Sequence, residues 1–289
     1  MATLGDEATP VFYPERNIKL VVEYDGGGYH GWQRQAGCLT IQEVIESRLG
    51  IMLGQRVGIN ASGRTDAGVH AKGQVINFRV RTRLSAEEIQ KGLNSLLPDD
   101  IAVIAAQEVP RSFHARFSAL SKVYEYHILN RLAPTALLRK YLWHVRNPLA
   151  VAPMRECLKI VCGKNDFSAF MASGSPVSST SRTMLRAELE NLGPDRLKFT
   201  FEADGFLRHM VRNLTGTLVE VGKGKKTTTD FERILKSGDR KQAGITAPGR
   251  GLYLMSVNYG QNGGLSSGGN RDEVICNDWQ DKTLCHPGD

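Results

Sequence analysis

The segment 62–71, SGRTDAGVHA, brings together residue types that can do chemistry. Asp66 offers a carboxylate nucleophile or base, Arg64 can bind a phosphate, and His70 titrates near neutral pH. A solvated turn with an Arg64–Asp66 ion pair would use the same residue types. The segment is long for a hairpin loop, however, and long loops disproportionately carry function. We therefore take it as the candidate functional loop, in which His70 contacts a ligand or only caps the loop.

A second signal precedes this loop, because Gly26, Gly28 and Gly31 fit the pattern G-x-G-x-x-G directly after a predicted strand. In a dinucleotide-binding turn a helix opens at the third glycine, so that its N-terminus holds the pyrophosphate. Here the helix signal begins only at Thr40. We favour a turn whose small residues permit close backbone approach. A nucleotide-dependent enzyme remains an alternative.

Two arginines near the C-terminus could supply a cation to the loop. A helix predicted at 205–221 carries a core-facing apolar stripe of Leu207, Val211, Leu214, Leu218 and Val221. Arg208 and Arg212 lie one turn apart on the flank of that stripe. A cation close to Asp66 would favour the ionised carboxylate when a bound substrate excludes water. Solvated surface arginines are the alternative, which stays open for Arg208.

The elements that must position these residues follow one order twice. The first half is predicted to contain a strand, a helix, two strands, a helix and a strand, at 17–24, 40–53, 55–61, 73–80, 85–96 and 101–109. The second half is predicted to contain a strand, a helix, two strands, two helices and a strand, at 121–130, 149–162, 181–190, 196–204, 205–221, 229–236 and 252–259. Thr40 with Glu43, and Ser85 with Glu88, predict capping boxes at two of these helices.

The order β-α-β-β-α-β in each half is typical of the ferredoxin-like split βαβ fold. The sequence thus predicts an α+β protein of two ferredoxin-like, RRM-like halves, whose sheets join edge to edge around a central RNA-binding cleft on the face opposite the helices. The predicted segments are an N-terminal extension (1–16), a first half with the Asp66 loop (17–112), a second half (113–260) and a flexible acidic tail (261–289).

Charge and composition narrow the function classes. The formal net charge is +7, and the tail holds two basic against five acidic residues, which leaves +10 on residues 1–260. This favours a polyanionic partner such as nucleic acid, although scattered basic residues also keep proteins soluble. No apolar run reaches the length of a membrane helix, and no secretory signal precedes the first strand, so we expect a cytoplasmic protein without a membrane partner.

The cysteines give no sign of a disulfide framework or a metal site. There are five, without a C-x-x-C pair, so we expect free thiols. Cys276, Cys285 and His286 match no familiar zinc spacing, and we predict no metal.

Six motifs give the chain a resemblance to a known family. The segment GRTDAGVHA (63–71) is the signature of the TruA-type tRNA pseudouridine synthases. The other motifs resemble that family in the expected order: YDGGGYHGWQRQ (24–35), FHARFSA (113–119), SKVYEY (121–126), GFLRHMVRNLTG (205–216) and GLYL (251–254). The chain is identified as a member of this family over residues 17–260.

The resemblance implies a function and a set of residues. The family isomerises uridine to pseudouridine at positions 38 to 40 of tRNA, in the anticodon stem-loop, as a homodimer and without metal, organic or nucleotide cofactor. It implies that Asp66 is the catalytic carboxylate, that Tyr124 and Arg212 complete the catalytic set, and that Leu252 closes the uracil pocket. Arg64 would replace or steer the flipped nucleotide.

Arg208 is a further candidate for substrate binding. Two of the family positions also have a structural interpretation: Tyr124 could be a cross-strand core aromatic alternating with Tyr126, and Leu252 a core residue. A different class of protein, an RNA-binding module of two RRM-like halves, is weakly favoured by Lys72, Gly73 and Phe78. Gln74 and Ile76 stand where that module would need stacking aromatics.

Overall fold

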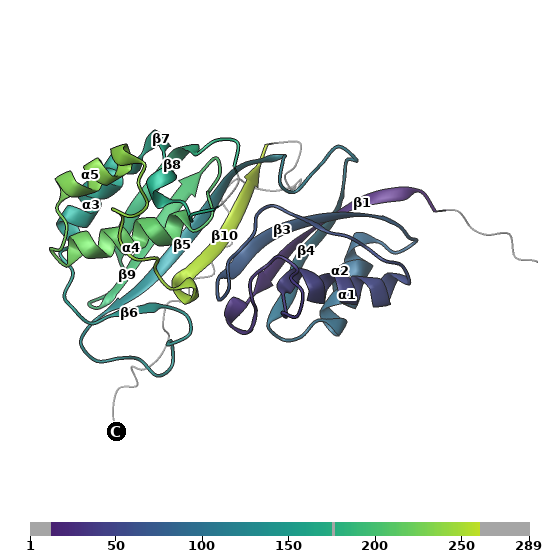
Figure 1. The fold of residues 1–289 in the computed structure, drawn as a ribbon. Helices are drawn as coiled ribbons and strands as arrows, with labels where there is room; N and C mark the ends of the chain where they lie inside the picture. The colour runs from purple at the N-terminus through teal and green to yellow at the C-terminus, as the bar shows by residue number, and fades with distance from the viewer. Residues whose placement is uncertain (1–12, 175–176, 261–289) are drawn as a thin grey trace, which may run out of the picture.

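The computed structural model describes residues 13–174 and 177–260 (Figure 1). Its strands are β1 (Glu15–Tyr24), β2 (Asn60–Ala61), β3 (His70–Arg81), β4 (Ile101–Val109), β5 (Ala119–Asn130), β6 (Trp143–Val145), β7 (Gly163–Asp166), β8 (Ser181–Asn191), β9 (Arg196–Ala203) and β10 (Leu252–Tyr259). Its α-helices are α1 (Ile41–Leu53), α2 (Ala86–Leu96), α3 (Val151–Val161), α4 (Met210–Gly222) and α5 (Thr228–Ser237). Short 3₁₀ turns lie at Gly26–Gly28 (η1), Ser168–Phe170 (η2) and Gly249–Gly251 (η3).

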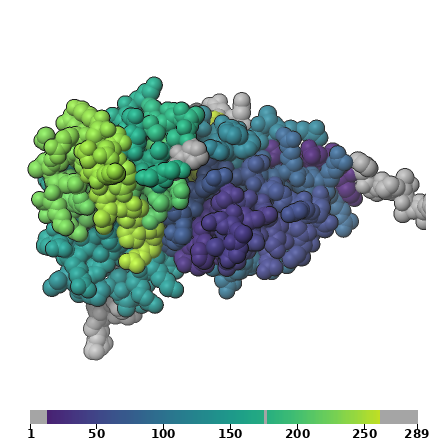
Figure 2. All heavy atoms as spheres, viewed as in Figure 1, coloured from purple at the N-terminus to yellow at the C-terminus, as the bar shows by residue number. Residues whose placement is uncertain are grey.

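The strands form one continuous mixed sheet in the order β4-β1-β3-β10-β5-β9-β8-β7, with β2 added to β3 and β6 to β5. Every neighbouring pair along the main path is antiparallel except β3 and β10, which run parallel where Tyr253 lies beside His70 and Leu254 beside Ala71. This parallel pair joins the N-terminal and C-terminal halves of the chain. They form two adjoining lobes in the space-filling view (Figure 2).

Helices of both halves cover the same face of this sheet. Residues in register on neighbouring strands point to the same face, and one such row crosses the middle of the sheet through Tyr24, Ala71, Leu254, Tyr124 and Phe201. All five belong to the main core, together with the apolar sides of the helices. Helices α1 and α2 lie over the N-terminal half and α3 to α5 over the C-terminal half (Figure 1).

The predicted capping boxes had opposite outcomes. At α2 the Ser85 hydroxyl accepts from the Glu88 amide while the Glu88 carboxylate accepts from the Ser85 amide, which confirms the box. At α1 the Thr40 side chain makes no capping bond. The first amides of α1, of Ile41 and Gln42, donate instead to the backbone carbonyls of Gly31 and Trp32. The preceding turn therefore caps α1, and the box predicted there was wrong.

Two further element predictions differ from the structure, and two strands were missed. The strand predicted at 55–61 is only Asn60–Ala61, because the Ile59 amide donates to the carboxylate of Glu46 on α1 and not to a strand. The helix predicted at 205–221 begins at Met210, since His209 has a left-handed backbone with φ of 63°. Strands β6 and β7 were not predicted.

Several predictions concern residues 1–12 and 261–289, which lie outside the described residues. They include most of the N-terminal extension, the acidic tail, and Cys276, Cys285 and His286. Within the described part, Cys38, Cys157 and Cys162 are free thiols. No set of His, Cys, Asp and Glu side chains is placed there to hold a metal ion. No helix in the same ranges is long and apolar enough to span a membrane.

Candidate active site

The candidate loop begins where β2 ends and enters β3 at His70, and its first residues are fixed by polar contacts with the sheet. The Ser62 amide donates to the Val75 carbonyl, and the Gln74 side chain accepts from the Ser62 hydroxyl and donates to the Gly63 carbonyl. The Tyr24 and Thr65 hydroxyls lie 2.8 Å apart in a buried hydrogen bond. These contacts fix the backbone on one side of Asp66.

Two glycine turns hold the loop from either side. A Cβ at Gly26 would lie 2.0 Å from the Val69 carbonyl oxygen, and one at Gly31, whose φ is 91°, would lie 2.7 Å from that of Thr65. On the other side a Cβ at Gly249 would lie 2.4 Å from the Ala67 carbonyl oxygen. The G-x-G-x-x-G segment thus permits close backbone approach, as favoured from the sequence. No helix opens at Gly31, so this turn lacks the context that a dinucleotide-binding turn requires.

This packing predicts different effects for two glycines of the same turn. In Gly26→Ala the new methyl group must displace the loop, and a shift of about 1 Å at a catalytic group can cost about 10²-fold in rate. Nothing lies within 4 Å of a Cβ at Gly28, so Gly28→Ala should retain the parent rate. Turnover and thermal unfolding of both variants test this expectation. Equal losses in the two variants would contradict it.

Asp66 is contacted by two side chains from the start of α4. The Arg212 Nη1 donates to Asp66 Oδ2 over 2.8 Å, and His209 Nε2 lies 3.5 Å from the same oxygen. Burial lowers the pKa of His209 and nearby arginines lower it further, although Asp66 opposes them. A lowered pKa keeps most of the His209 population neutral at pH 7. Arg212 is thus the cation that balances Asp66.

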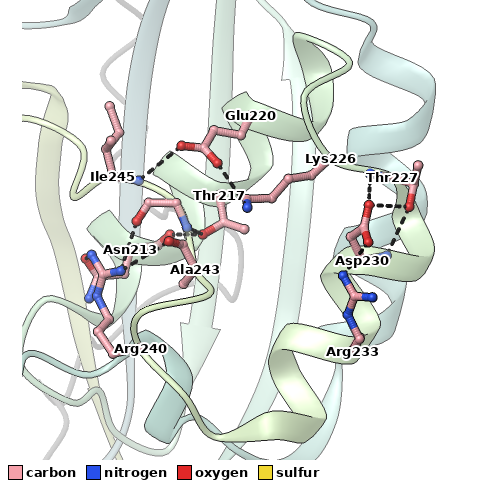
Figure 3. Close-up of polar contacts among 11 residues, drawn as sticks. Asn213, Thr217, Glu220, Lys226, Thr227, Asp230, Arg233, Arg240, Ala243 and Ile245 are labelled. Carbon is pink, nitrogen blue, oxygen red and sulfur yellow. Dashed lines mark hydrogen bonds and ion pairs between the residues drawn. The ribbon is translucent and has the colours of Figure 1, made fainter.

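Arg212 is held in place by a second bond, from its Nε to the Ala247 carbonyl over 2.7 Å. The segment that carries Ala247 is fixed along α4: Arg240 donates to the Asn213 side chain, and the Gly244 amide donates to the Thr217 hydroxyl (Figure 3). The guanidinium therefore bridges the carboxylate and a backbone carbonyl. Two parallel bonds to the carboxylate, the other geometry available to an arginine, are not formed.

Tyr124 lies on β5 beside the loop and is 7% exposed. Its ring meets the ring of Phe206 edge to face, with centroids 5.0 Å apart. Burial, with smaller contributions from Tyr24 and Asp66, raises the pKa of Tyr124 well above its usual value. The phenol consequently stays protonated at neutral pH, as a donor and an aromatic surface. Tyr126 packs separately, edge to face with Trp143.

The site lies on the face of the sheet that carries the helices. Tyr24 and Tyr124 both point to that face, and Arg212 reaches Asp66 from α4, which packs on it. The sequence analysis predicted the RNA-binding cleft on the opposite face of the sheet, whereas Asp66 and Arg212 meet on the face that carries the helices.

The remaining candidates take different positions. Arg64 is exposed and forms no ion pair with Asp66. Arg208 precedes α4 and is exposed, and within the described ranges its side chain forms no hydrogen bond or ion pair. The prediction that Arg208 lies on the same helix as Arg212 was wrong, because α4 begins after Arg208. Leu252 is buried at the start of β10, in register with Tyr126.

Sequence reasoning missed His209 and Phe206 as parts of the site. Both belong to the segment GFLRHMVRNLTG, yet in a continuous helix His209 would not have been distinguished from its neighbours. His209 is the one non-glycine residue of the described ranges with a positive φ. Such a backbone is uncommon outside glycine and is often found near functional sites. Histidine is one of the residue types enriched in this conformation, but the residue type alone does not single out one position of the sequence.

Comparisons with known proteins agree with the geometry. The chain matches the family model described as tRNA pseudouridine synthase over residues 20–118 and 158–260. It is 47% identical over 244 residues to the tRNA pseudouridine synthase A of Thermoanaerobacter sp. (strain X514), and the matched residues cover 84% of this chain and 100% of that relative. It is 44% identical over 244 residues to the tRNA pseudouridine synthase A 2 of Clostridium perfringens (84% and 100%), and 45% identical over 245 residues to the tRNA pseudouridine synthase A of Geobacter sp. (strain M21) (84% and 99%).

The matched residues include the Asp66 loop and Arg212, which the fold brings together from two separate parts of the sequence, whereas Tyr124 lies between the two matched ranges. The identities extend over nearly the whole length of the relatives. The chain therefore belongs to the TruA-type tRNA pseudouridine synthases, isomerases that convert uridine to pseudouridine in tRNA.

Proposed function

We propose that Asp66 is the catalytic carboxylate of this isomerase. The observation that carries this assignment is the contact between Asp66 and Arg212. A half-buried carboxylate on a fixed loop, with one arginine bonded to it, is suited to act on a glycosidic carbon. The reaction breaks the N1–C1′ bond of uridine, rotates the freed uracil and joins its C5 to C1′. It involves no net change of oxidation state, and no cofactor is required.

The other residues take roles that follow from their positions. Asp66 promotes cleavage of the glycosidic bond, by bonding covalently to the substrate or by stabilising positive charge at C1′. Arg212 balances the charge of the carboxylate and orients it when RNA excludes water. Tyr124 stacks on the uracil, and its hydroxyl is placed to pass on the proton lost from C5. Leu252 closes the apolar side of the pocket.

The target nucleotide must leave the helical stack to reach Asp66, at a cost of a few kcal/mol. Exposed Arg64, two residues before Asp66, replaces it in the stack or holds its phosphate. Arg208 contacts the RNA backbone. The substrate is the anticodon stem-loop of tRNA at positions 38 to 40, and the enzyme acts in the cytoplasm as a homodimer, in which one subunit holds the body of the tRNA.

The strand orders support two ferredoxin-like halves, at 17–112 and 113–260. Around β1 the order is β4-β1-β3, with β2 on the far side of β3, and around β5 it is β10-β5-β9-β8. Both correspond to the first strand of a βαββαβ unit lying between its fourth and third strands. In this proposal the duplicated architecture forms the RNA-binding cleft at the junction.

One assay tests this function against its alternatives. Unmodified tRNA labelled with tritium at C5 of uridine is incubated with the protein, with EDTA and without a nucleotide. We expect tritium release and pseudouridine confined to the anticodon arm. Binding of tRNA without release would indicate the non-catalytic RNA-binding module. Release that depends on an added nucleotide would indicate the nucleotide-dependent enzyme.

A further inference from the structure

Lys122 is a cation without an anionic partner beside the candidate active site. It lies on β5 two residues before Tyr124, so both side chains point to the helix-bearing face, about 7 Å apart along the strand. The side chain is half-buried. In the part of the chain that the structure describes, its ammonium group forms no hydrogen bond and no ion pair. The charged groups that act on it are Arg116 and Arg182, which are also cations.

This arrangement costs stability. Burial and the two arginines lower the pKa of Lys122 to about 8, which shows that its surroundings disfavour the charged amine. Buried charges are ordinarily paired. The charged groups that act on Lys122 are thus all positive, which matches the charge of an anionic ligand.

The recess opens toward the catalytic loop at Gly63. A Cβ at Gly63 would lie 3.5 Å from Lys122 Nζ and 4.0 Å from the Tyr124 hydroxyl. The missing side chain thus leaves a space that the amine and the phenol both face. Arg182, one of the two arginines that act on Lys122, has its Nε 3.2 Å from a Cβ at Gly205 and donates to the carbonyls of Ser179 and Ser181. The other, Arg116, is exposed on the segment between β4 and β5.

We propose that Lys122, with Arg116 and Arg182, binds a backbone phosphodiester of the substrate RNA adjacent to the nucleotide that enters the Asp66 pocket. This proposal rests on the proposed function, because it takes the ligand to be RNA. The spacing of Lys122 and Tyr124 along β5 lets one residue hold a phosphate while the other contacts the neighbouring uracil. Lys122 is thereby a positioning residue, which fixes the position of the RNA strand relative to Asp66.

The test measures binding of an unmodified anticodon stem-loop RNA carrying one neutral methylphosphonate linkage at a time. In the parent protein, one linkage next to the target uridine should weaken binding by about tenfold or more, as expected for a lost charge-assisted bond. In Lys122→Met the same methylphosphonate linkage should have no further effect on binding. The slope of log affinity against log salt should fall by about one. Lys164→Met, which removes an exposed lysine on β7, is the matched control and should behave as the parent.

Three further measurements exclude a structural role. Lys122→Met should unfold at the parent temperature or above it, because it removes an unpaired half-buried charge while keeping the apolar stem. Gly63→Ala makes only ordinary van der Waals contacts and should fold, yet its methyl group fills the recess and should weaken binding. Parent affinity should fall as the pH rises from 7 to 9, because Lys122 loses its proton. In that range Tyr124 stays neutral, because burial raises the pKa of its phenol, so Lys122→Met should lose this dependence.

Equal effects of every methylphosphonate on the parent and on Lys122→Met would overturn the phosphate site. So would a marked fall in the unfolding temperature of Lys122→Met together with parent-like binding by Gly63→Ala. The proposed function fails separately, if the parent protein releases no tritium from labelled tRNA. The phosphate coupling at Lys122 can be measured in either case, since it needs binding and not turnover.

Discussion

Replacing Asp66 by Asn should abolish turnover while the protein still folds and binds tRNA. Asn keeps the size of the side chain and an oxygen that can accept from Arg212, but it removes the negative charge on which cleavage at C1′ depends. Loss of a central catalytic group typically costs on the order of 10⁴-fold or more. Tritium release measures the rate, and a titration with unmodified tRNA measures the affinity. We expect affinity to be unchanged or higher, because repulsion between the carboxylate and the RNA phosphates is removed.

The control for this variant is the unfolding temperature, since Asp66 is part of a polar network with Arg212 and His209. The amide introduced in Asp66→Asn can present its oxygen to both side chains, so the folded state should be preserved. A rate close to that of the parent would remove Asp66 from the mechanism. A folded variant that no longer binds tRNA would instead make Asp66 a binding residue.

Replacing Arg212 by Lys should cost about 10²-fold in rate, with little change in tRNA affinity. The guanidinium bonds Asp66 through Nη1 and the Ala247 carbonyl through Nε, 2.8 Å and 2.7 Å away. A lysine ammonium cannot reproduce this planar bridge. Loss of one charge-assisted bond is worth about 1.5–3 kcal/mol, and each 1.4 kcal/mol is about tenfold in rate.

Arg208 provides the matched comparison, because it is exposed and forms no side-chain bond within the described ranges. Arg208→Lys should be mild in both rate and affinity. Arg208→Ala should weaken tRNA binding and lower the slope of log affinity against log salt by about one, as for a lost phosphate contact. Rate and affinity of all three variants at several salt concentrations test both roles. An inactive Arg208→Lys beside an active Arg212→Lys would reverse them.

The loop that carries Asp66 was predictable because its chemistry is local in sequence. Arg64, Asp66 and the flanking glycines occur within one decade of the chain, and apolar residues define the long strand that follows it. Periodicity likewise predicted β1, β5, β9 and most of the helices within a few residues. These features depend on neighbours in the chain, which a sequence displays directly.

Features that depend on hydrogen bonds from outside the local segment could not be predicted from the sequence in this way. The amide of Ile41 is satisfied by Gly31, and that of Ile59 by Glu46, so neither the capping box nor the strand proposed there could form. The left-handed conformation of His209 likewise shortens α4 without changing the apolar stripe, whose Leu207 is buried outside the helix. For Ile41 and Ile59 the deciding hydrogen bond comes from outside the local segment.

The central position of β10 bears on how the enzyme matures during synthesis. It is the last strand of the described chain, yet it lies between β3 and β5 and provides the only pairing between the two halves on the main path of the sheet. Strands β1, β3 and β4 can pair as soon as they emerge, whereas the junction must close a loop of well over a hundred residues, which slows folding. The loop that carries Asp66 is therefore made early, whereas its surroundings are completed late. We expect a nascent chain still short of Tyr259 not to hold Asp66 and Arg212 in their final register, so that RNA near the ribosome meets an active enzyme only after elongation of this domain has ended.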